Sequence, residues 1–105
     1  MGNRYLPRRR RKALEDIAEY AELISSDSLR SGLLFLDAVE KTVMQICDNP
    51  ESGGAIPTKS EGTGLLRAKL IDGFKAYAIL YVVDSEFIDV LRIVRGGQDI
   101  ESVAW

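Results

Sequence analysis

The feature that most constrains the fold is a series of three apolar runs in the second half of the chain, separated by short turn sequences. The runs are of strand length and cover Gly64–Ile71, Phe74–Val83 and Phe87–Arg95. The first break, Asp72-Gly73, is a strong signal for a two-residue hairpin turn, and the sequence DSE at 84–86 also predicts a turn. The runs therefore predict an antiparallel meander of three strands.

The first half of the chain carries helical periodicity instead. From about Arg10, apolar residues recur at helical spacing and form one stripe of Leu14, Ile17, Ala18, Ala21 and Ile24. The sequence SSDS follows, in which Ser26 or Asp27 is a suitable N-cap. A second stripe then continues to the stop signal DNP at 48–50, with Leu29, Leu33, Leu36, Val39, Val43 and Ile46. Two helices joined by so short a turn predict an antiparallel hairpin.

Two other segments complete the expected architecture. Asn3–Leu6 is expected to form a short first strand, with Pro7 as the boundary before the first helix. The stretch NPESGGAIPTKSEGTG predicts a loop; it lacks the glycine before lysine of a phosphate-binding loop and follows a helix. We expect an α+β fold in which an N-terminal strand and a two-helix hairpin pack on one face of a small antiparallel sheet, in a single domain spanning residues 1–105.

Composition excludes several kinds of chemistry. The chain has no histidine and only one cysteine, Cys47, so histidine-dependent triads, zinc sites and an internal disulfide are not expected. We expect no metal and no cofactor. The longest apolar run, Ala76 to Val83, is too short to span a membrane, and no signal peptide is visible. A cytoplasmic protein without a membrane segment is the simplest expectation.

Charge is distributed unevenly along the chain. Residues 1–12 contain six basic residues and no acid, whereas the remainder carries eight basic and 16 acidic residues. The sequence PRRRRK could bind the phosphates of a nucleic acid. It could also be the entry from a strand into a helix, paired with the protein's own acids. We favour the second interpretation and expect no direct binding of nucleic acid, because the acidic body would repel it.

Alternation along the strands predicts a basic patch on the sheet. If Leu66 and Leu91 both face the helices, then Arg67, Lys69 and Arg92 project from the open face. Such cations could bind an anion or stabilise an anionic transition state. Cleavage of RNA would also benefit from a general acid and a general base. The available candidates form no convincing set; they are Asp89, Asp99, Tyr77 and Tyr81.

The order of these elements and several short sequences resemble the ParE toxins of the RelE/ParE superfamily. ALEDIAEY at 13–20 resembles the first helix, NPESGG the turn after the second, and LLRAKLIDGFKAYAILYVVDSEFIDVLRIVRGGQDIESV the strands that follow. The positions that match the family pattern are Arg67, Gly73, Phe74, Tyr77, Tyr81, Leu91, Arg92, Gly96 and Asp99. Two positions depart from it, Arg95 where many members have histidine and Gln98 where many have arginine.

The resemblance implies a toxin of a type II toxin–antitoxin system, neutralised by a cognate antitoxin of the ParD kind or a similar one. ParE-like members inhibit DNA gyrase by binding it and stalling its DNA-cleaved state, whereas RelE-like members cut mRNA on the ribosome. This chain lacks the dense Lys/Arg loop and the C-terminal tyrosine of the RelE branch. We therefore expect a gyrase inhibitor without catalytic activity. A RelE-type endoribonuclease is the alternative, and a member that binds its antitoxin but has lost toxicity is a third.

The resemblance and the strand pattern together give two sets of candidate site residues, none of them catalytic. The residues expected to contact a target or partner are Arg67, Lys69, Arg92, Arg95, Gly96, Asp99 and Trp105. Asp99 is also expected to fix the turn that begins at Gly96-Gly97. The antitoxin groove is expected between the helical hairpin and the sheet, at Leu14, Ile17, Tyr20 and Tyr77. An antitoxin tail rich in acids would suit the basic residues.

Overall fold

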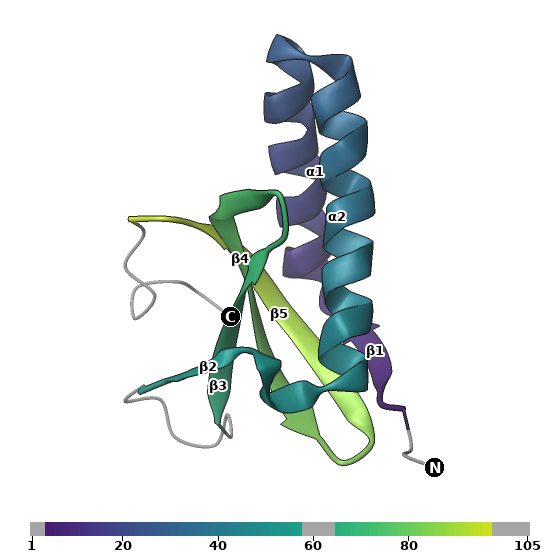
Figure 1. The fold of residues 1–105 in the computed structure, drawn as a ribbon, viewed down its shortest axis with the longest axis vertical. Helices are drawn as coiled ribbons and strands as arrows, with labels where there is room; N and C mark the ends of the chain where they lie inside the picture. The colour runs from purple at the N-terminus through teal and green to yellow at the C-terminus, as the bar shows by residue number, and fades with distance from the viewer. Residues whose placement is uncertain (1–3, 58–64, 98–105) are drawn as a thin grey trace.

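A computed structural model describes residues 4–57 and 65–97, in which two helices pack on one face of a five-stranded sheet (Figure 1). The sheet order is β1-β5-β4-β3-β2. The expected α+β fold is confirmed. The elements in chain order are β1 (Leu6–Arg9), α1 (Arg11–Asp27), α2 (Leu29–Asp48), the 3-10 turn η1 (Pro50–Ser52), β2 (Gly54–Ile56), β3 (Leu66–Ile71), β4 (Phe74–Asp84) and β5 (Phe87–Arg95).

The predicted meander is present with its two short turns. Ile71 pairs with Phe74 across the first turn, where Gly73 has a φ of 81°, in the left-handed region that favours glycine. Asp84 pairs with Phe87 across the second turn, and Ser85 there has a φ of 56°. The meander therefore supplies the three central and longest strands of the sheet.

The two outer strands differ from the prediction. β1 covers Leu6–Arg9 rather than Asn3–Leu6 and pairs parallel to β5, so the sheet is mixed rather than purely antiparallel. Pro7 lies inside β1 instead of ending it; a proline is tolerated there because β1 is an edge strand. β2 lies within the predicted loop, where Gly54–Ile56 pairs with β3. Both outer strands are short, which explains why periodicity alone does not reveal them.

The principal core lies between the helices and the sheet. On α2, Phe35, Val39, Val43 and Ile46 are fully buried, whereas Leu29, Leu33 and Leu36 are exposed. The apolar stripe predicted for α2 is therefore correct at its C-terminal half and wrong at its N-terminal half. The reason is the side of the helix on which they lie, since Phe35, between Leu33 and Leu36 in the sequence, is buried against Phe74 and Tyr77 of β4. The N-cap of α2 is Ser28, which accepts a hydrogen bond from Ser31 N–H, rather than Ser26 or Asp27.

A second apolar cluster occupies the opposite face of the sheet. Its members come from β3, β4 and β5 only, and they are Leu66, Leu80, Val82, Leu91 and Val94. Leu66 and Leu91 thus face away from the helices, contrary to the assumption behind the predicted basic patch. Within the described ranges 4–57 and 65–97, neither helix is long and apolar enough to cross a membrane.

A β-bulge in β5 explains why simple alternation fails there. Tyr81 pairs with Val90 and Leu80 pairs with Arg92, so Leu91 has no direct partner on β4. The extra residue shifts the facing of every position that follows. As a result Val90 and Ile93, three residues apart, both belong to the core against the helices.

Candidate functional site

Arg92 is held by a carboxylate from the first helix. Its Nε and one terminal nitrogen donate to the two oxygens of Asp16 at 2.7 and 2.9 Å. The same carboxylate accepts from the backbone N–H of Ile93 at 3.0 Å. Asp16 is buried, and its hydrogen bonds raise the pKa of the Arg92 guanidinium. The geometry gives Arg92 a structural task, the attachment of α1 to the edge of β5.

Arg67 and Tyr81 anchor the turn that follows α2. Tyr81 Oη donates to the carbonyl of Pro50 at 2.6 Å and accepts from Gly53 N–H at 3.0 Å. Arg67 donates to the carbonyl of Gly53 at 2.7 Å. Burial raises the pKa of the Tyr81 hydroxyl, which favours its neutral, donating form. These two residues of the family pattern therefore fix the start of β2.

The predicted basic patch on the open face is wrong. Arg67 pairs with Tyr81 and Lys69 pairs with Ile79, and both partners belong to the core against the helices. Directly paired residues point to the same face of a sheet, so Arg67 and Lys69 lie on the helix side. Arg92 pairs with Leu80 of the open-face cluster, but its guanidinium is bound by Asp16 of α1. The three cations do not form one surface.

The basic N-terminal arm pairs with the protein's own acids, as expected. Arg8 donates to both oxygens of the buried Asp89, at 2.7 and 3.0 Å, and also reaches Asp84 at 2.9 Å. The hydrogen bonds to Asp89 raise the pKa of Arg8. Further ion pairs join Arg4 to Asp48, Arg9 to Glu40 and Arg10 to Asp89. The arm therefore serves to hold β1 and the start of α1 in place.

The four residues of the expected antitoxin groove have different surroundings. Tyr77 is buried, with its ring edge-on to Tyr20 at 4.9 Å between centroids, and Ile17 packs against the same core. Leu14 is half exposed. A surface hollow of about 410 Å³ lies on the outer flank of α1, lined by Glu19, Tyr20, Glu22, Leu23 and Ser26. Tyr20 is thus the expected groove residue that borders this hollow, and Leu23 is an apolar neighbour that the sequence did not single out.

The C-terminal end of β5 holds the remaining described candidates. Arg95 is exposed, with its guanidinium carbon 5.9 Å from the centre of the Tyr77 ring. The N–H of Gly96 donates to the carbonyl of Ala76 at 2.6 Å, and Gly97 has a φ of 88°. The turn at Gly96-Gly97 is thus held against β4. Asp99 and Trp105 lie outside the described residues.

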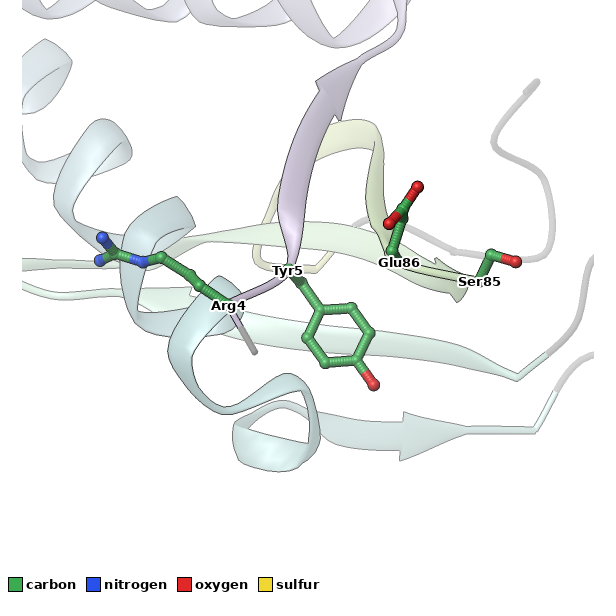
Figure 2. A pocket seen from close by; sticks show the side chains of 4 residues that line it. All are labelled: Arg4, Tyr5, Ser85 and Glu86. Atoms are coloured by element: carbon green, nitrogen blue, oxygen red, sulfur yellow. The ribbon is translucent and has the colours of Figure 1, made fainter. Parts of the chain in front are cut away.

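A second hollow lies near the N-terminus, beside the turn between β4 and β5. It has a volume of about 390 Å³ and is lined by Arg4, Tyr5, Ser85 and Glu86. Figure 2 shows the Tyr5 ring between Arg4 on one side and the β4–β5 turn on the other, with the Arg4 and Glu86 side chains pointing in different directions. Among residues 4–57 and 65–97, no three potential ligand side chains gather to hold a metal ion.

Comparison with known proteins identifies this arrangement. Residues 8–100 match the family of ParE toxins of the type II toxin–antitoxin system parDE, a range that includes both helices, β2 to β5 and the second half of β1. The chain belongs to the ParE toxin family. The resemblance read from the strand motifs is thereby confirmed for this ParE toxin, whereas the search of curated proteins gave no match.

A solved structure supports the fold of this ParE-family toxin. The chromosomal ParDE toxin–antitoxin system from P. aeruginosa contains a chain that is 17% identical, with a TM-score of 0.69. The match covers 87% of this toxin and 95% of that chain. At this level of identity the comparison establishes the shared fold.

Asp16 is the main structural residue that the sequence did not single out for this ParE toxin. In the sequence, only the position of Asp16 indicates this role. It lies next to Ile17 and three residues after the buried Ala13, on the core side of α1. A carboxylate at such a position needs a buried partner. The sequence points to Arg92 as a candidate for contact with an anion or a partner, and does not show that its counter-ion is Asp16.

Proposed function

We propose that this ParE-family toxin inhibits DNA gyrase by protein–protein binding, without a catalytic reaction of its own, and that a cognate antitoxin neutralises it in the cytoplasm. The family match carries the proposal. Arg67 and Arg92, which a ribonuclease would use against RNA, donate instead to Gly53 and Asp16. Tyr81, a candidate proton donor, has its hydroxyl engaged with Pro50. Because these side chains already form hydrogen bonds within the protein, gyrase is favoured over mRNA as the target.

The surface for gyrase is expected at the end of β5. Arg95 is exposed there, beside a glycine turn that is fixed to β4 by the Gly96–Ala76 hydrogen bond. A rigidly placed cation suits contact with an acidic or DNA-bearing partner. Asp99 and Trp105 remain proposed members of the same surface on the basis of the resemblance.

The surface for the antitoxin is expected on the outer flank of α1. The hollow there offers Tyr20 and Leu23 as apolar contacts, and Glu19 and Glu22 line it with negative charge. An antitoxin segment with apolar anchors and basic neighbours would fit this surface. An acidic antitoxin tail has less support than the sequence suggested, because Arg67 and Arg92 already bond within the toxin.

A pair of reactions with the purified toxin tests the target. In the first, gyrase relaxes or supercoils a plasmid in the presence of the toxin; in the second, ribosomes translate a defined mRNA. The proposal expects loss of supercoiling with accumulation of cleaved plasmid, and intact mRNA. Intact supercoiling together with mRNA cut on the ribosome would establish the RelE-type alternative.

A further inference from the structure

Apolar side chains are buried on the face of the sheet that the helices leave open. They form the open-face cluster described above, whose members are Leu66, Leu80, Val82, Leu91 and Val94. None of them is more than 8% exposed, and Leu80 on the central strand β4 is fully buried. Leu70 lies on the same face, since it pairs with Ala78 and Ala78 pairs with Val94, yet it is 56% exposed. Something therefore shields the cluster from water but does not reach Leu70.

The described elements do not supply this cover. Side chains stand roughly perpendicular to a sheet, so their outer ends meet water unless a further layer lies above them. The partly buried apolar residues that pack against the cluster are Ile56, Ala68 and Ala78, which are themselves in β2, β3 and β4. Within residues 4–57 and 65–97, both helices lie on the other face (Figure 1). The cover is therefore expected from residues beyond these ranges.

One of the remaining segments has suitable apolar side chains. Residues 58–64 read TKSEGTG and contain no hydrophobic residue. Residues 1–3 precede Arg4, which pairs with Asp48 at the end of α2, on the helix side of the sheet. Residues 98–105 read QDIESVAW and contain Ile100, Val103 and Trp105. Composition and attachment thus both favour residues 98–105.

Residues 98–105 also start close to the cluster and are long enough to cross it. They follow the turn at Gly96-Gly97, three residues after Val94, where the φ of 88° at Gly97 lets the chain leave the direction of β5. Val82 lies four residues along β4 from Ala78, the partner of Val94, which corresponds to about 14 Å. Eight residues span at most about 26–29 Å when extended. The far members of the cluster are therefore within reach.

We propose that residues 98–105 pack back on the open-face cluster, with Trp105 as their largest apolar contact. The sheet then has a layer on each face, the helices on one and this segment on the other. Burial of an aromatic ring removes a large apolar surface from water, which favours the contact. The ring has two faces, and one face against the sheet leaves the other for the contact with gyrase proposed above. The packing itself does not depend on gyrase.

The fluorescence of Trp105 tests the proposal directly, because it is the only tryptophan in the sequence. We expect the folded full-length toxin to emit at a shorter wavelength than the urea-unfolded toxin and to resist quenching by acrylamide, since the sheet shields the ring from water. Emission equal to that of the unfolded chain, in a toxin that circular dichroism shows to be folded, would overturn the proposal. The emission should not change with protein concentration. A shift to shorter wavelength at rising concentration would place the ring between copies of the chain and would also overturn it.

A matched pair of leucine variants locates the contact. Leu91→Gln, within the cluster, is expected to shift the Trp105 emission toward that of the unfolded toxin, whereas Leu70→Gln, on the same face but outside the cluster, leaves it unchanged. Ile100→Ser should give the same shift as Leu91→Gln and keeps the test open if that variant does not fold, because β5 ends at Arg95 and no residue of the sheet is altered. Equal shifts from Leu91→Gln and Leu70→Gln, or an unchanged emission in Ile100→Ser, would show that the ring lies elsewhere and would overturn the proposal.

Discussion

Asp16 on α1 and Arg92 on β5 form a two-pronged ion pair whose carboxylate also accepts the backbone N–H of Ile93. The pair lies beyond the end of β1, which pairs with β5 only from Phe87 to Val90. Where β1 ends, the carboxylate of Asp16 thus accepts the backbone N–H of Ile93 that a neighbouring strand would otherwise bond. The contact joins the helical hairpin to the strand that leads to the proposed gyrase surface.

Removal of either partner should destabilise the fold strongly. Asp16→Ala or Arg92→Ala each leaves a largely buried charge without its counter-ion, and we expect a loss of about 3 kcal/mol in the free energy of unfolding. The double variant should lose less than the sum, with a coupling energy of about 2 kcal/mol. Urea denaturation of the four proteins measures this. Additive effects would show that the two side chains act independently.

The hydroxyl of Tyr81 should matter more than that of Tyr77. Tyr81→Phe leaves the Pro50 carbonyl and the Gly53 N–H without their shared partner, at a cost of about 1–2 kcal/mol in unfolding free energy. Tyr77→Phe is the control, because in the described residues the Tyr77 ring is held by edge-on contacts with Tyr20 and Phe35. Equal losses in thermal or urea melts would argue against the anchoring role of Tyr81.

The close approach of the two helices should not tolerate a methyl group at Gly32. A Cβ there would lie 1.7 Å from Ser25 Oγ and 3.1 Å from the Ala21 carbonyl oxygen. Gly32→Ala is expected to cost about 1–3 kcal/mol in unfolding free energy through forced separation of the helices. Gly54→Ala is the control, since nothing lies within 4 Å of the added atom. A Gly32→Ala variant as stable as the control would mean that the hairpin repacks freely.

Alkaline pH should weaken the fold through its buried tyrosines. Burial raises the pKa of both Tyr81 and Tyr20. A raised pKa means that folding favours the neutral hydroxyl. The stabilisation is therefore complete below the ordinary tyrosine pKa of about 10 and is lost as the pH rises through the folded value. Absorbance titration of wild type and Tyr81→Phe should show that the variant lacks one tyrosine that ionises above the ordinary pKa. A variant with the same number of tyrosines ionising at high pH as the wild type would contradict a raised pKa for Tyr81.

The antitoxin is expected to bind α1 at Leu23 rather than α2 at the exposed Leu33. Leu23→Glu should weaken antitoxin binding at least about tenfold, because it adds a charge to the hollow beside Tyr20. Leu33→Glu, at an exposed leucine of α2, is the matched control and should bind the antitoxin as wild type does. Calorimetry or surface binding with the purified antitoxin provides the measurement. The opposite ranking of the two variants would place the antitoxin on the exposed leucines of α2 instead.

The sequence predicted most of the fold because its signals are local. The turn at Asp72-Gly73 and the end of α2 at Asp48 depend on neighbouring residues. The facing of Leu91 could not be predicted, because the bulge there arises from pairing between β4 and β5. The role of Asp16 depends on a partner 76 residues away. Such contacts decide which side chains are available for function, so the site was less predictable than the elements.

The exposed leucines show a related limit. Leu33 and Val43 have the same helical periodicity, yet Leu33 is 59% exposed and Val43 is buried. The difference is the side of α2 that meets the sheet, since Phe35, two residues after Leu33, is the residue buried against Phe74 and Tyr77 of β4. Periodicity identifies an apolar face, but only the tertiary structure shows which of its residues are buried in the core and which are exposed.

The most direct test of the account is the amount of cleaved plasmid that purified gyrase accumulates with this toxin, compared with Arg95→Glu and with Arg30→Glu at the exposed hairpin tip. We expect the wild type and Arg30→Glu to convert supercoiled plasmid to gyrase-linked linear DNA, and Arg95→Glu to need at least about tenfold more protein. A wild-type toxin that leaves gyrase cleavage and supercoiling unchanged, while the antitoxin still binds it, would contradict the central claim.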